Sequence, residues 1–169
     1  MKKSLSPNIR RRFTVLLPLA LLVSGCKHGN IGQMEFHEGE VQHAVLVGDV
    51  PWGPCPPHLP AGCEIAVLEG NPQAEGIFTV RFRVDAGFVM APHTHPNDER
   101  VTVLTGKVAV GFGPDASRED ANVFGPGDYY VNARDAIHTV WADEPSIVQV
   151  TGMGPWEAHF VDDENGGKD

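Results

Sequence analysis

The sequence predicts an all-β chain with a single domain, built as an antiparallel jelly-roll barrel. Apolar and polar residues alternate over residues 77–84, which puts Phe78, Val80, Phe82 and Val84 on one face of a half-buried strand. Short strand-like runs recur through the rest of the chain with glycine and proline between them, and no segment has a long amphipathic helical period. Many short strands at such spacing are typical of a sandwich or barrel. A jelly roll of two antiparallel sheets accommodates them.

The expected strands follow one another along the chain with turns between them. An early strand is expected near residues 42–47, and a short apolar strand at 64–68 precedes the alternating strand at 77–84. The remaining expected strands are 88–95, 99–104, 107–112, 121–124, 128–132, 137–142 and 146–151. Glycine and proline separate them as turn-forming residues, at Gly106, Pro114, 125–127 and Pro145.

The first 25 residues have the layout of a lipoprotein signal peptide. Five basic residues precede an apolar run at 13–23, which has 11 residues and is too short to span a bilayer as a mature helix. Residues 23–26 read Val-Ser-Gly-Cys and resemble a bacterial lipobox, in which Cys26 is lipidated and becomes the new N-terminus. The alternative is an ordinary cleaved signal peptide with an incidental cysteine. Lys27 favours a protein anchored to the outer membrane and facing the periplasm.

Removal of this segment leaves a chain of single-domain length with a strongly acidic balance. Residues 26–169 are 144 residues, and they keep 8 of the 13 basic residues and all 22 acidic ones, a formal charge of −14. We divide them into a tether at 26–42, one domain at 43–158 and an acidic tail at 159–169. Nucleic acid is an unsuitable partner, because its binding depends on Lys and Arg that neutralise phosphates.

Cys55 and Cys63 bracket a short proline-rich loop. In an oxidising compartment such a pair indicates a disulfide. Two alternatives are a pair of free buried thiols and a zinc site that includes His58, although these residues supply only three ligands. A bridge would stiffen the loop modestly, because a short loop has little closure entropy to lose.

The chemistry of the chain is concentrated at residues 87–106. His93 and His95 lie two residues apart, so on an extended strand both imidazoles point to the same side. Residues 96–98 read Pro-Asn-Asp, a tight bend that would return Glu99 to the same point from the next strand. Downstream, His138 follows another strand-like run and offers a fourth ligand. Three imidazoles and a carboxylate suit a divalent transition metal.

This spacing resembles the cupin superfamily. The first cupin motif is Gly, five residues, His-x-His, three or four residues, Glu, six residues and Gly, and Gly87, His93, His95, Glu99 and Gly106 all meet it. The resemblance covers roughly residues 60 to 155. It implies that His93, His95, Glu99 and His138 hold a metal inside the barrel.

The second cupin motif is only partly kept. Gly127 and His138 have the expected separation, whereas Ala133, Asp135 and Ala142 stand where the motif has Pro, Gly and Asn. These departures weaken the turn before His138 and leave the ligand in place. More narrowly, the chain resembles small secreted single-domain cupins of the ChrR-like group, at residues 59–62, 68–72 and 154–156. Such relatives mostly lack an assigned activity, so the resemblance implies a fold and a metal and no substrate.

The surroundings of the metal suggest a pocket for a small molecule. Apolar residues available to build it are Phe78, Phe82, Phe88 and Met90. Aromatic residues available to line its mouth are Tyr129, Tyr130 and Trp141, and candidate clamps for a carboxylate are Arg81, Arg83 and Arg100. The same strand face as His138 carries Ala136, Val140 and Ala142, which are small and apolar.

Two interpretations of function remain open at this point. The first is a metal-dependent enzyme, an oxygenase or isomerase of a small organic molecule, with Fe, Mn, Zn or Ni as the ion. The second is a non-catalytic cupin that binds or senses a metal or ligand, and a purely structural lipoprotein would leave the ligand spacing unexplained. The expected partners are a small-molecule ligand or substrate, a membrane through the lipid anchor, and a second copy of the chain in a homodimer.

Overall fold

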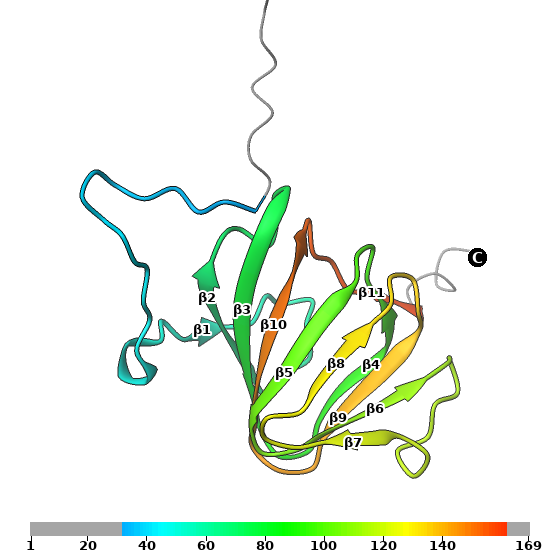
Figure 1. Cartoon of the computed structure of the whole chain (residues 1–169). Helices are drawn as coiled ribbons and strands as arrows, with labels where there is room; N and C mark the ends of the chain where they lie inside the picture. Colours follow the sequence, from blue (N-terminus) through cyan, green and yellow to red (C-terminus); the bar gives the residue numbers. More distant parts are fainter. Residues whose placement is uncertain (1–31, 162–169) are drawn as a thin grey trace, which may run out of the picture.

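The structure is a computed structural model that describes residues 32–161. Within that range the protein has eleven strands and one short 3-10 helix, η1 (Val47–Asp49). The strands form two antiparallel sheets that face each other, as Figure 1 shows. The predicted all-β jelly-roll architecture is therefore confirmed.

The first sheet has six strands in the order β1-β2-β3-β10-β5-β8. Each neighbouring pair runs antiparallel, and the longest ladder joins β3 to β10 from the Val84–Ser146 pair to the Gly76–Gly154 pair. Its strands are β1 (Gly53–Pro54), β2 (Cys63–Glu69), β3 (Gly76–Val84), β10 (Ser146–Gly154), β5 (Glu99–Thr105) and β8 (Tyr129–Asn132).

The second sheet has five strands in the order β11-β4-β9-β6-β7. Strand β4 lies between β11 and β9, so two segments from the C-terminal part of the domain flank a strand from its middle. Its strands are β11 (His159–Phe160), β4 (Phe88–Thr94), β9 (His138–Ala142), β6 (Val108–Phe112) and β7 (Asn122–Phe124).

The core lies between the two sheets and follows the predicted alternation. In β3, Phe78, Val80, Phe82 and Val84 are buried, while the residues between them are partly or fully exposed. The inner faces of β4, β5 and β10 add Met90, Val101, Val103 and Val150 to the same cluster. Burial of such side chains contributes on the order of 1.5–3 kcal/mol each to the stability of the fold.

Gly106 ends the first motif because the turn there has no room for a side chain. Its φ is +70°, a conformation that L-residues rarely adopt. A Cβ at this position would collide with the carbonyl oxygen of Pro145 and with Ser146. The glycine thus lets the turn after β5 pack directly against the start of β10.

Cys55 and Cys63 form a disulfide, with their Cα atoms 5.7 Å apart. This separation lies within the roughly 4.4–6.8 Å that a bridge allows. The predicted pairing is present in the structure, and it leaves neither sulfur free to ligate zinc with His58. The bridge closes the loop that carries Leu59, whose side chain is buried against the core.

Most of the expected strands are found within a few residues of their predicted ends, and one is wrong. Residues 42–46 form no strand, and η1 follows them. Apolar residues there are largely exposed, with Leu46 at 67% and Val47 at 88%, so no sheet buries the run. Strands β1 and β11 were not expected, because each has only two residues.

Several predictions lie outside the described residues. These are the signal peptide at 1–25, the lipidation of Cys26, the first part of the tether and the acidic tail from residue 162 onward. Among residues 32–161, no helix has the length and apolar character needed to cross a membrane.

Candidate metal centre

Strands from both sheets bring the four predicted ligands together. His93 lies in β4 and is paired in register with His138 at the start of β9, so the two imidazoles are neighbours across the ladder. His95 follows β4 directly. The bend at 96–98 then carries the chain from the second sheet to the first, where Glu99 opens β5. All four side chains are buried, with residue exposures between 0% and 7%.

The three histidines form a compact cluster. Each offers one ligand atom, and these atoms all lie within 4.8 Å of one another. Their ring centroids are 4.2 Å apart for His93 and His138, 4.8 Å for His93 and His95, and 5.3 Å for His95 and His138. Three buried histidines in this arrangement could hold a metal ion.

Backbone carbonyls fix the tautomer of every histidine in the cluster. The Nδ1 atom of His93 donates to the carbonyl of Ala91 at 2.8 Å, and that of His138 donates to Ala136 at 2.9 Å. The Nδ1 atom of His95 donates to the carbonyl of Glu157 at 2.7 Å. A carbonyl only accepts, so each Nδ1 carries the proton and each neutral ring keeps an Nε2 lone pair. Metal-bound histidines are commonly oriented in this way.

Two of these Nε2 atoms are buried without a hydrogen-bond partner, those of His95 and His138. The nearest oxygens belong to the Glu99 carboxylate, 3.4 Å from Nε2 of His95 and 3.7 Å from Nε2 of His138. Both approaches are too long for good hydrogen bonds. Buried polar atoms are rarely left unpaired, so the orphaned nitrogens fit a bound metal better than a simple packed core.

Glu99 is held by two donors that sequence reasoning missed. The amide Nδ2 of Asn132 donates to its Oε2 at 3.1 Å, and the indole Nε1 of Trp156 donates to its Oε1 at 3.3 Å. Asn132 is paired with Glu99 across the β5–β8 ladder. Trp156 also stacks on His95, with the ring centroids 4.9 Å apart. Both residues therefore position the carboxylate that faces the histidines.

The titration of the cluster follows from burial and from its mutual contacts. Burial, and then the charges of His138 and His95, lower the pKa of His93 from 6.5 to about 3, so this ring is neutral near pH 7. Burial favours a higher pKa for Glu99, but the charge of His95 and the contact with His138 outweigh it and lower the pKa to about 2. The carboxylate is therefore ionised.

The turn before His138 keeps its shape despite the lost motif residues. Asp135 replaces the motif glycine and adopts a φ of +61°, the left-handed conformation that the glycine would favour. Aspartate tolerates this region better than most side chains. The backbone N–H of Asp135 also donates to the carbonyl of His95 at 2.9 Å. This bond ties the turn to the strand end that carries another ligand.

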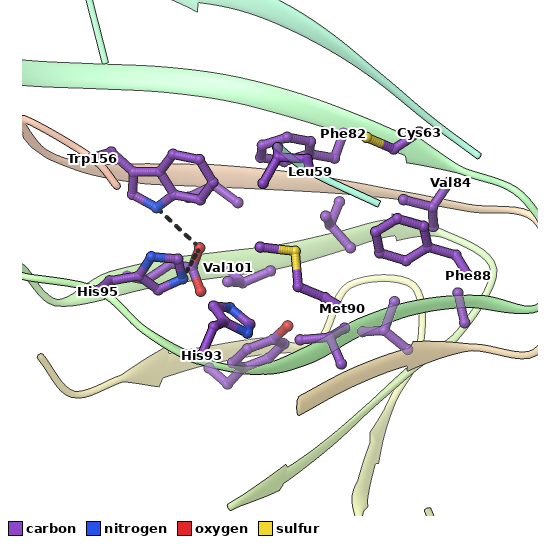
Figure 2. A pocket seen from close by; sticks show the side chains of 17 residues that line it. Leu59, Cys63, Phe82, Val84, Phe88, Met90, His93, His95, Val101 and Trp156 are labelled. Atoms are coloured by element: carbon purple, nitrogen blue, oxygen red, sulfur yellow. Dashed lines mark hydrogen bonds and ion pairs between the residues drawn. The ribbon is translucent and has the colours of Figure 1, made fainter. Parts of the chain in front are cut away.

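A cavity opens from the histidine cluster into the barrel. Figure 2 shows His93, His95 and Trp156 at one end and Val84 and Phe88 at the other, with Met90 between them. Tyr130 also lines it. Burial, with a smaller effect from the charge of Glu99, raises the pKa of Tyr130 above its ordinary value, so its phenol stays protonated.

The pocket prediction was right for some residues and wrong for others. Phe82, Phe88, Met90, Tyr130, Val140 and Ala142 all line the cavity. Phe78 instead lies in the closed core, Tyr129 is 58% exposed, and Trp141 does not line the cavity. The three arginines are not carboxylate clamps here, because they lie on strand faces that point away from it.

Two antiparallel sheets that enclose three inward-facing histidines define a protein of the cupin class. The chain belongs to the ChrR Cupin-like domain family, which matches residues 40–157. No curated protein matches the chain.

Solved structures give the same fold. The polyketide cyclase RemF from Streptomyces resistomycificus is 19% identical, with a TM-score of 0.59 over 72% of this chain and 86% of the other. An acetylacetone dioxygenase from Acinetobacter johnsonii is 20% identical, with a TM-score of 0.58 over 78% of this chain and 85% of the other. KdgF from Halomonas sp. is 23% identical, with a TM-score of 0.51 over 64% of this chain and 89% of the other. At these identities the likeness is one of fold.

Proposed function

We propose that this protein is a metal-dependent cupin enzyme, an oxygenase or isomerase that acts on a small organic molecule. The observation that carries the proposal is a cluster of three buried imidazoles whose Nδ1 atoms all donate to backbone carbonyls. The Nε2 atoms of His95 and His138 are thereby left buried without a hydrogen-bond partner, and His93 and His95 line the end of a cavity. A folded core gains nothing from that arrangement without a ligand, because the unpaired buried nitrogens cost free energy.

His93, His95, His138 and Glu99 would hold the metal. Neutral imidazoles and one carboxylate sum to −1, so a divalent ion leaves the site at +1. Such an ion supplies Lewis acidity, or redox chemistry if it is iron or manganese. Fe, Mn, Zn and Ni all accept these ligands; affinity alone favours the later metals over Mn and Fe, and the ligand set does not select one ion.

The other residues around the cluster orient the Glu99 carboxylate, form the apolar walls of the cavity and supply a hydrogen-bond donor. Asn132 and Trp156 keep the Glu99 carboxylate facing the histidines. The apolar walls exclude bulk water, which strengthens electrostatic interactions inside the cavity. Tyr130 lines the cavity and offers its protonated phenol as a hydrogen-bond donor there. An acetylacetone dioxygenase and a polyketide cyclase share the fold, which supports an enzyme acting on a small oxygen-bearing molecule.

The second candidate is a non-catalytic cupin that binds or senses a metal or ligand. It is favoured by one observation: within residues 32–161, no acid–base pair lines the cavity apart from the proposed ligands and Tyr130. Metal removal separates the two functions. An enzyme stays folded and loses turnover, whereas a structural site loses stability when the ion leaves.

We also propose that Cys26 is lipidated and that the domain faces the periplasm from the outer membrane. The support is the lipobox-like sequence at residues 23–26 and the disulfide between Cys55 and Cys63, which suits an oxidising compartment. Homodimer formation stays a prediction.

The test is elemental analysis of protein purified from its own compartment, followed by oxygen-uptake screening with small phenols and enols. We expect a divalent transition metal close to one per chain and metal-dependent turnover. Glu99→Gln should lose most of the metal and turnover while the fold survives. The matched control Glu119→Gln makes the same change at an exposed position and should behave as wild type. Full metal content in Glu99→Gln would remove Glu99 from the ligand set. Turnover that survives complete metal removal would overturn the proposed enzyme.

A further inference from the structure

The cavity has a polar end and an apolar remainder. Its polar lining residues are His93, His95, Glu99 and Tyr130. The Glu99 carboxylate faces the histidines, and Tyr130 is paired on β8 with Val101, two residues after Glu99 on β5. Every other lining residue is apolar, aromatic or half of the disulfide, including Phe82, Val84, Phe88 and Met90. A bound molecule can therefore place one polar group at the histidine end, and its remainder contacts only hydrocarbon, sulfur and aromatic rings.

Nothing in the apolar part can neutralise a charge. Six lysine and arginine side chains occur in residues 32–161, and none of them lines the cavity. Three of them lie on β3 and β5, the strands that also carry lining residues, and they are engaged elsewhere: Arg81 donates to Gln149 at 3.1 Å, Arg83 pairs with Glu64, and Arg100 lies 3.8 Å from Asp98. A charge buried without a partner costs several kcal/mol or changes its protonation state.

The space is small. The cavity volume is about 70 Å³, whereas one water needs about 10–15 Å³ on the same measure. A few waters or one compact organic molecule therefore fit. Met90 crosses the middle of the cavity, and its flexible thioether can adapt to the shape of a guest.

We propose that the cavity accepts a compact molecule with one oxygen-bearing head group and an uncharged apolar body. The head oxygen faces the histidine end, where Tyr130 can donate a hydrogen bond to it, and the body fills the space between Met90, Val84 and Phe88. Molecules that carry a carboxylate, phosphate or several hydroxyls on the body are excluded, because no lining residue replaces their hydration. This inference rests on the proposed function, since it names the substrate class of the same site.

Matched probes test the inference through a methyl group inside the cavity. The probes are pentan-2-one and 4-methylphenol, each paired with an analogue that replaces the terminal methyl by a carboxylate, 4-oxopentanoate and 4-hydroxybenzoate. The readout is the ¹³C-methyl resonance of Met90, assigned with Met90→Leu, in titrations of metal-loaded and metal-free protein. We expect saturable shifts with at least one neutral probe and at least tenfold weaker effects with its carboxylate. A carboxylate that binds as well as its neutral partner, or no shift with either neutral probe, would overturn the inference.

A pair of valine substitutions locates the binding. Val84 lines the cavity, whereas Val89 lies on β4 outside the lining and is 44% exposed. Val84→Thr adds a hydroxyl at nearly constant volume and should weaken the neutral probe by about fivefold or more, while Val89→Thr should leave binding unchanged. Equal effects of the two substitutions would place the probe elsewhere and overturn the inference.

Failure of this inference is distinguishable from failure of the proposed function. If neutral probes shift the Met90 methyl resonance but the protein has neither metal nor turnover, only the proposed enzyme function is overturned. If the protein has metal and turnover but prefers charged probes, only the inferred substrate class is overturned.

Discussion

Asn132→Leu should weaken metal binding without weakening the metal-free fold. The side chain is 2% exposed, and its Nδ2 donates to Oε2 of Glu99, but its Oδ1 is buried without a partner. Leucine has a similar size and removes both features at once. Loss of a hydrogen bond to a carboxylate costs about 1.5–3 kcal/mol, and removal of an unsatisfied buried oxygen recovers about 1–3 kcal/mol. The two effects nearly cancel in the metal-free protein.

Metal affinity should respond differently, because among residues 32–161 the indole of Trp156 is then the one remaining hydrogen-bond donor to Glu99. Substitution of residues that orient a metal ligand typically costs 10–100-fold in affinity, which corresponds to about 1.4–2.7 kcal/mol. Competition with a chromogenic chelator, using Zn²⁺ as the probe, measures this affinity. Urea unfolding in the presence of a chelator measures the stability of the metal-free protein.

Thr139→Val is the matched control for Asn132→Leu. Thr139 is also buried, but it does not line the cavity. Its Oγ1 also lacks a hydrogen-bond partner and therefore makes no hydrogen bond to Glu99. We expect unchanged zinc affinity and unchanged or slightly higher stability. The reasoning is refuted if Asn132→Leu binds zinc like wild type, or if both substitutions lower affinity equally.

Three further predictions follow from other parts of the chain. Cys26→Ser should leave an unprocessed precursor or move the domain from the membrane to the soluble fraction, and soluble, trimmed wild-type protein would contradict lipidation. Gly106→Ala should lower the free energy of unfolding by about 2 kcal/mol or more. An alanine in the left-handed conformation of Gly106 costs about 1–2 kcal/mol, and its Cβ would also collide with Pro145 and Ser146. An unchanged urea midpoint would contradict this prediction. In metal-free protein the free energy of unfolding should fall as the pH drops from about 6.5 towards 3, because the unfolded chain protonates His93 in that window and the folded chain does not. His93→Gln should flatten the upper part of that pH profile, and a wild-type profile that is already flat would contradict the prediction.

Local sequence patterns were sufficient to predict much of the fold. The alternation in β3 identified its buried face, because a strand puts successive side chains on opposite sides. The same rule placed His93, in β4, and His95, directly after it, on one side of the chain, and the short bend after them brought Glu99 back. The run near residues 42–47 was misleading, since an apolar run becomes a strand only where a neighbouring strand can pair with it.

Asn132 and Trp156 hold Glu99 through contacts between segments that are far apart in the sequence, and no local sequence pattern predicts such contacts. Asn132 meets Glu99 only because β8 pairs with β5 in one register, and a shift of one residue would turn it outward. Trp156 reaches Glu99 from 57 residues away along the chain. Its only signal in the sequence was the Gly-Pro-Trp ending shared with the ChrR-like group. The alternation in β3 already placed Arg81 and Arg83 on the face opposite to Phe82. The sequence therefore already indicated that these arginines point away from the cavity and cannot clamp a carboxylate there.

The most direct test of the metal centre is an anomalous-scattering map from crystals of the metal-loaded protein, recorded at the absorption edge of the bound ion. We predict one strong peak among His93, His95, Glu99 and His138, at about 2.0–2.2 Å from each ligand atom for a zinc-like ion. A peak at another place, or histidines that keep their Nε2 atoms unliganded in crystals soaked with excess metal, would contradict the account.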